Sequence, residues 1–146
     1  MTTDQLAQDI GPTTELALRY LDAAWNRFDL AAVDELADPQ LRVYYPLMPE
    51  ATTDRKSFTQ VLRMIQAGLP DAHMDLRHVA TEADTAVFAW NARATHTGEL
   101  FGIAPTGRDV RWSGLSVVDI SDGRVTAEWG EEDALGFLRQ LGAVPA

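Results

Sequence analysis

The chain has 146 residues, of which 46% are hydrophobic and 23% are charged, and its formal net charge at pH 7 is -10. This length and composition are typical of one globular domain with a hydrophobic core, which we expect to span residues 1–146. An acidic surface of this size repels phosphate groups, so nucleic acid and anionic membranes are poor candidate partners.

Cysteine is absent, which rules out disulfides, thiolate metal sites and a cysteine nucleophile. The N-terminal stretch MTTDQLAQDIG has neither the basic start nor the apolar run of a secretory signal. No apolar run approaches the roughly 20 residues that a transmembrane helix needs. We therefore expect a soluble protein of the cytoplasm.

The first half of the chain predicts three helices and one short strand. Pro12 suits the first turn of a helix, and apolar residues follow it at near-helical spacing. Thr53 or Asp54 is a suitable N-cap for a later helix, which Gly68 ends. The predicted elements are a helix from Pro12 to about Phe28, a short helix over residues 29–38, a strand over residues 41–46 and a helix over residues 54–68.

The second half of the chain predicts a strand meander followed by a helix. Asp122-Gly123 is a strong signal for a two-residue hairpin turn. The predicted elements are strands over residues 73–81, 85–98, 108–121 and 124–129, and a helix over residues 131–142. Because helices come first and strands second, the order favours an α+β fold. A curled sheet around the early helices would enclose a mostly apolar hollow suited to a small molecule.

The chain carries no recognisable metal or nucleotide motif. His73, His78 and His96 lie at spacings that match no usual ligand pattern, and there is no GxGxxG, Walker or GxSxG motif. The glycine-rich stretch over residues 95–107 is best interpreted as a connection between two long strands. We therefore predict neither a metal nor a cofactor.

Strand alternation singles out Glu128 as a candidate acid or base. Alternation places Val125, Ala127 and Trp129 on one face of their strand and Glu128 on the other. If Glu128 faces a hollow lined by Trp112 and Tyr45, desolvation should raise its pKa to a useful range. If it faces water, it is an ordinary surface glutamate. One face of the preceding strand, over residues 108–121, combines an aromatic ring, a glycine and a hydroxyl, namely Trp112, Gly114 and Ser116. This mixture suits a ligand cavity better than a close-packed core.

Asp133 has two interpretations. It is a candidate catalytic carboxylate, and it is equally suited to cap the last helix or to occupy its first turn. Leu135, Leu138 and Leu141 of that helix are expected to seal one end of the fold.

The stretches THTGELFGIAPTGRDV and ISDGRVTAEWGEEDALGFLRQLG closely resemble the SnoaL-like polyketide cyclase family, and a looser pattern covers nearly the whole chain. The resemblance implies a cone-shaped α+β barrel like that of nuclear transport factor two, in which a curved, mostly antiparallel sheet wraps around N-terminal helices and encloses an apolar pocket. It also implies a homodimer. Such cyclases close a ring on an aromatic polyketide by aldol condensation, using an acid/base carboxylate without metal or cofactor.

The resemblance carries over to individual residues only in part. Gly130 stands where the cyclases keep their catalytic aspartate, and Asp133 matches a later aspartate. Glu128 replaces a histidine of the cyclases, and His96 is retained from their H-x-G element. The catalytic candidates are therefore Glu128, His96 and Asp133, and the substrate-binding candidates are Trp25, Tyr45, Val61, Trp90, Trp112 and Ser116.

These observations favour a cofactor-independent enzyme that acts on a hydrophobic, polyketide-like molecule as an aldol-type cyclase or an isomerase. Three alternatives stay open. The resemblance includes hydroxylase-like relatives and an epoxide-opening branch, and the same cone also serves as a binding module without catalysis. Gly130 in place of the family aspartate is the feature that favours the last alternative.

Overall fold

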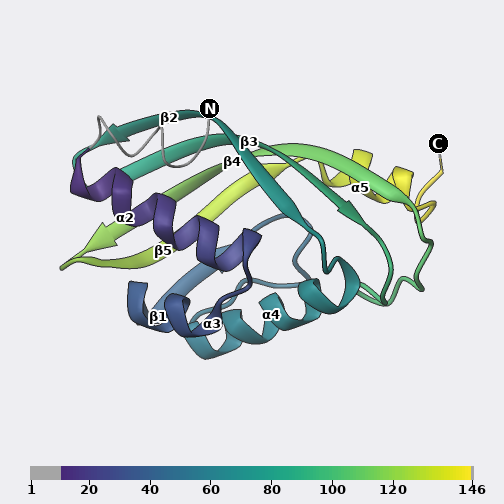
Figure 1. Ribbon diagram of the computed structural model, residues 1–146, viewed down its shortest axis with the longest axis horizontal. Helices are drawn as coiled ribbons and strands as arrows, with labels where there is room; N and C mark the ends of the chain where they lie inside the picture. The colour runs from purple at the N-terminus through teal and green to yellow at the C-terminus, as the bar shows by residue number, and fades with distance from the viewer. Residues whose placement is uncertain (1–10, 146) are drawn as a thin grey trace.

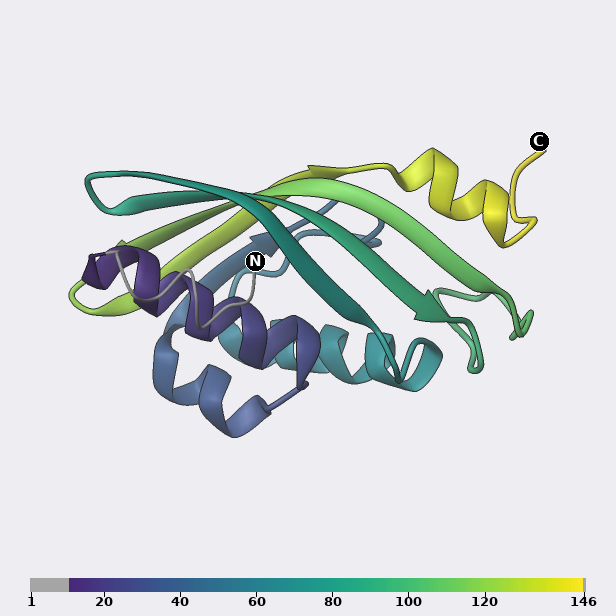
Figure 2. The same ribbon diagram turned by 45° about the horizontal axis from the view of Figure 1, so that its top comes forward.

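The computed structural model describes residues 11–145. Residues 1–10, which include most of the stretch that shows no secretory signal, lie outside the described residues. A strongly curved five-stranded sheet arches over α2, α3 and α4, which lie on its concave side (Figures 1 and 2). The predicted α+β fold with a curved sheet around N-terminal helices is confirmed. The sheet does not close, because β1 and β2 remain as its two edges.

The elements follow one another in the predicted order. The helices are α2 (Pro12–Leu21), which continues into the π-helical turn η1 (Asp22–Asn26), then α3 (Leu30–Leu36), α4 (Arg55–Gly68) and α5 (Ala134–Gln140). The strands are β1 (Ala37–Tyr44), β2 (His73–Glu82), β3 (Thr85–Thr95), β4 (Asp109–Ser121) and β5 (Arg124–Glu132). Their order in the sheet is β1-β5-β4-β3-β2, with β1 parallel to β5 and every other pair antiparallel.

Local capping explains where the helices begin. Pro12 opens α2, and the Asp54 side chain accepts a hydrogen bond of 2.7 Å from the Ser57 N–H at the start of α4. The strand that we predicted over residues 41–46 begins earlier, at Ala37. It contains Pro39, which has no backbone N–H to donate. An edge strand tolerates proline because the N–H groups on its outer side have no partner strand.

The strict alternation that we predicted for β5 is wrong. Val125 and Glu128 are both fully buried although they are three residues apart. Asp119 of β4 pairs with Ala127, whereas the next residue pairs with Val125, so Thr126 is an extra residue in a β-bulge. Beyond the bulge, alternate residues starting from Glu128 face the concave side of the sheet, and those between them face outward.

The last helix is shorter than predicted because β5 continues to Glu132. Asp133 then caps α5, since its side chain accepts a hydrogen bond of 2.9 Å from the Gly136 N–H. Phe137 and Leu141 are buried, whereas Leu135 is 52% exposed. The expectation that Leu135 helps to seal the fold is therefore wrong, and Phe137 takes that role with Leu141.

The core consists of two apolar clusters. The larger cluster lies between the helices and the concave face of the sheet, and the smaller one lies around Leu69, Leu100 and Phe137 near α5. No helix within residues 11–145 is long and apolar enough to cross a membrane. The site described next lies where the two clusters meet.

Candidate active site

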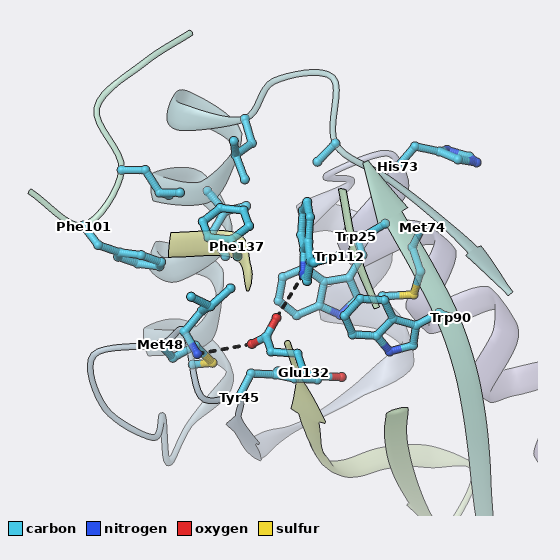
Figure 3. Close-up of a pocket in the computed structure, with 16 residues that line it drawn as sticks. Trp25, Tyr45, Met48, His73, Met74, Trp90, Phe101, Trp112, Glu132 and Phe137 are labelled. Atoms are coloured by element: carbon cyan, nitrogen blue, oxygen red, sulfur yellow. Dashed lines mark hydrogen bonds between the residues drawn. The ribbon is translucent and has the colours of Figure 1, made fainter. Parts of the chain in front are cut away.

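An apolar pocket with about 660 Å³ of empty space opens between the two core clusters. Its lining is predominantly apolar with a few polar groups, as is usual for small-molecule sites. Three indole rings from different elements form much of its wall (Figure 3). The lining residues are Trp25, Tyr45, Leu47, Met48, Ile65, Leu69, Ala72, His73, Met74, Trp90, Ala92, Leu100, Phe101, Trp112, Glu132 and Phe137.

Glu132, at the end of β5, is the one carboxylate among these lining residues. Its side chain reaches into the pocket with Trp112 on one side and Tyr45 on the other (Figure 3). Its Oε1 accepts a hydrogen bond of 3.1 Å from Trp112 Nε1, and its Oε2 accepts one of 3.2 Å from the Leu47 N–H. Burial raises the pKa of Glu132, and these two bonds only partly offset that effect. Glu132 is thus a carboxylate held in a fixed orientation in an apolar site.

Glu128 lies on the same face of β5, fully buried behind the pocket wall. It accepts hydrogen bonds of 2.7 Å from Tyr20 Oη and from Trp25 Nε1, and a third from Tyr45 Oη. Burial raises the pKa of Glu128 from 4.5 to about 7, although the three donors act in the opposite direction. It is not among the lining residues.

Tyr45 separates the two carboxylates. Gly130 lies between Glu128 and Glu132 along the strand, and a Cβ atom at Gly130 would overlap the Leu115 backbone oxygen and lie 2.6 Å from Tyr45 Cε1. The Tyr45 ring therefore fills the space over Gly130. Its hydroxyl also bonds to Ser116 Oγ, which in turn accepts a hydrogen bond of 2.8 Å from Trp90 Nε1.

The structure brings together only some of the residues predicted for the site. Trp25, Tyr45, Trp90 and Trp112 line the pocket, and Ser116 supports two of them from behind. Val61 is partly buried on α4 and packs on the larger core cluster.

His96 and Asp133 serve local structure. His96 Nδ1 lies 3.0 Å from Thr106 Oγ1 and accepts a bond of 3.3 Å from the Thr106 N–H, which ties together the β3–β4 connection. Asp133 is exposed at the start of α5. His73 lies at the pocket edge, but its ring points away from the pocket (Figure 3). Among residues 11–145, no three His, Asp or Glu side chains are grouped closely enough to hold a metal ion.

Sequence reasoning missed Glu132. Three acids in a row before an apolar run, Glu131, Glu132 and Asp133, are typical of a helix start, so we assigned all three to the helix. A signal was present in the alternation, since Glu132 is four residues from Glu128 and so shares its face of an extended strand.

Comparison with known proteins assigns the chain to a family. A model of the SnoaL-like polyketide cyclases matches residues 15–141, which is most of the chain. The chain belongs to the SnoaL-like polyketide cyclase family. A search of curated proteins finds no match.

Solved structures of several other proteins have the same fold. AclR, a proposed hydroxylase from Streptomyces galilaeus, is 25% identical with a TM-score of 0.78, over 92% of this chain and 87% of its own. IdmH, a proposed polyketide cyclase from Streptomyces antibioticus, is 26% identical with a TM-score of 0.76, over 89% and 98%. A SnoaL-like protein from Jannaschia, 21% identical with a TM-score of 0.84 over 95% and 100%, supports the fold alone.

Together, the family match and these neighbours support a polyketide-related enzyme. They do not identify the reaction, because the neighbours include both a proposed cyclase and a proposed hydroxylase. The reaction has to be inferred from the pocket of this member.

Proposed function

We propose that the protein is a cofactor-independent acid/base enzyme that converts a hydrophobic, polyketide-like ketone into its enolate, as an aldol-type cyclase or an isomerase. The observation that carries the proposal is Glu132, a carboxylate with a raised pKa that lines an otherwise apolar, indole-rich pocket. A base in such a site is a stronger proton acceptor than a solvated carboxylate, because its charged form is poorly solvated.

In the proposed reaction, the ionised Glu132 takes a proton from the carbon next to a substrate carbonyl. The resulting enolate carbon attacks a second carbonyl of the same substrate and forms the new carbon–carbon bond. The alkoxide left on that second carbonyl then takes the proton back from Glu132, so no other reagent is consumed. In an isomerase, the proton would return instead to a different carbon of the enolate.

The surroundings of Glu132 suit this role. Donors on both of its oxygens, from Trp112 and the Leu47 backbone, fix the plane of the carboxylate. The rings of Trp25, Trp90 and Trp112 offer flat apolar surfaces to a polycyclic substrate and keep water from the enolate.

Glu132→Gln should slow proton abstraction strongly while the protein still binds the ketone. We expect the wild-type protein to exchange the α-hydrogens of 2-tetralone, a neutral enolisable ketone, for deuterium, followed by proton NMR in D2O. The variant should exchange about 10² to 10⁴ times more slowly, which is the usual worth of a general base. Calorimetric titration should still show binding, with a Kd within about tenfold of the wild-type value, because the amide keeps the size of the side chain but leaves one of the two N–H donors without an acceptor.

Glu131→Gln is the matched control, since Glu131 is the neighbouring exposed carboxylate. It should exchange the α-hydrogens of the ketone at the wild-type rate.

The wild-type rate of exchange should also rise with pH through the raised pKa of Glu132, because only the ionised form accepts a proton. Full exchange activity in the Glu132 variant would remove Glu132 from the mechanism, and binding without exchange by the wild type would indicate a binding module.

A further inference from the structure

Glu128 is a buried carboxylate that the proposed reaction does not use. It is fully buried, and no Lys, Arg or His within residues 11–145 forms an ion pair with it. An uncompensated buried charge is costly unless hydrogen bonds replace its lost hydration. Here three donors converge on its two oxygens. A glutamine matches this arrangement only in part, because its oxygen can accept from Trp25 and Tyr45 and its nitrogen can donate to Tyr20, but these bonds lose the added strength that the negative charge gives.

The three donors come from three different elements. Tyr20 belongs to α2, Trp25 to η1, and Tyr45 follows β1. Two of them, Trp25 and Tyr45, are pocket walls, whereas Tyr20 is not among the lining residues. The Trp25 and Tyr45 rings meet edge to face, with centroids 5.7 Å apart. Because the polar ends of both rings are fixed on one carboxylate, their apolar surfaces are presented to the pocket in one arrangement.

We infer that Glu128 is a positioning residue, whose ionised carboxylate holds Trp25 and Tyr45 in the substrate-binding wall. It therefore sets the affinity for the hydrophobic substrate, while proton transfer belongs to Glu132. The inference rests on the proposed function in one respect only, which is the assignment of proton transfer to the other carboxylate. The effect on binding stands on the geometry of the wall alone.

This arrangement makes substrate affinity depend on pH. The titratable groups that face Glu128 are Tyr20 from α2, Tyr45 after β1 and, at longer range, Glu132 on its own strand. Burial raises the pKa of both tyrosines well above 10, so neither ionises near neutrality. The pKa of Glu128 itself is about 7. Below that pH the carboxyl group gains a proton, and the hydrogen bonds that anchor Trp25 and Tyr45 lose the added strength that the negative charge gives them.

The test compares variants by calorimetric Kd for 2-tetralone and by α-deuteration rate at saturating ketone. Glu128→Gln should weaken binding about tenfold, because the bonds that anchor Trp25 and Tyr45 become neutral, and it should keep the saturated rate within about threefold. Tyr45→Phe should weaken binding in the same direction. Tyr20→Phe is the matched control, because it removes an equivalent hydrogen bond to the same carboxylate without touching the wall, and its Kd should stay within about twofold. Wild-type Kd should also rise below pH 7, and Glu128→Gln should lose that dependence.

Two results would overturn the inference. A loss of the saturated rate in Glu128→Gln with unchanged Kd would make Glu128 the base. Equal changes in Kd for Tyr20→Phe and Tyr45→Phe would show that the carboxylate serves only general stability, and this comparison decides the matter even if Glu128→Gln does not fold. If the wild type binds 2-tetralone without deuterating it, the proposed reaction fails, whereas the comparison of Kd values still tests the positioning role.

Discussion

Gly130 is the residue at which this pocket departs from the pattern of the cyclases that the sequence resembles. The resemblance places the catalytic aspartate at this position, but any side chain there would overlap the Leu115 backbone oxygen and the Tyr45 ring. The acids stand two residues to either side on the same face, as Glu128 and Glu132. The missing family carboxylate is thus a consequence of how Tyr45 packs, and it does not leave the pocket without an acid.

Gly130→Ala should lower the free energy of unfolding by about 1–3 kcal/mol, because a backbone carbonyl cannot move aside as a flexible side chain can. Urea denaturation measures the change. Gly11→Ala is the control, since Gly11 has negative φ and a Cβ there meets no described atom; it should cost less, about 0.5 kcal/mol, because Gly11 is the N-cap of α2, where alanine is less favoured than glycine. Equal stability of the two variants would mean that the space over Gly130 is not filled as described.

At the scale of elements, the junction between β5 and α5 places two neighbouring acids in different roles. Glu132 lines the pocket, whereas Asp133 caps α5. Asp133→Ala should lower the free energy of unfolding by about 1 kcal/mol, because it removes the N-cap of α5. Asp133→Asn keeps a capping oxygen and should restore most of that stability. Neither variant should change the deuteration rate of 2-tetralone, and a large loss of rate in Asp133→Asn would return Asp133 to the candidate bases.

The elements that could be predicted are those with local causes. The start at Pro12, the Asp54 cap and the turn at Asp122-Gly123 depend on residues a few positions apart, and the structure has all three. The bulge at Thr126 could not be predicted, because it depends on how β5 pairs with β4. Trp25 and Trp112 stood out from sequence as pocket walls. The assignment of Glu132 to a helix failed because acids before an apolar run have the same pattern at a strand end.

At the scale of the whole molecule, the outer face of the sheet carries an unusual apolar surface. Tyr44, Leu115 and Trp129 are all between 44% and 50% exposed. Tyr44 and Trp129 are direct neighbours across β1 and β5, and Leu115 lies on the adjacent β4. Large exposed apolar side chains on adjacent strands are typical of a protein–protein interface. We propose that this face pairs with a second copy of the chain.

Trp129→Glu should dissociate that dimer, because a charge in the centre of an apolar interface would be left unpaired. Sedimentation equilibrium should give twice the chain mass of 16.1 kDa for the wild type and 16.1 kDa for the variant. Leu135→Glu is the matched control, since Leu135 is similarly exposed but lies on α5, and it should remain dimeric. A wild-type protein of 16.1 kDa would rule out the homodimer.

The bulge at Thr126 determines which side chains of β5 face the concave side of the sheet and which face outward. If Thr126 instead took a regular position in the ladder, opposite Asp119, the later half of the strand would be turned over. Trp129 and Glu131 would then enter the hollow, and Glu128 and Glu132 would lie on the outer surface. The bulge therefore sets the two faces of the strand, with Glu128 and Glu132 on the concave side and Trp129 on the outer surface. A relative whose strand has the same length but pairs without the bulge would be expected to exchange the two faces together rather than to alter one side chain alone.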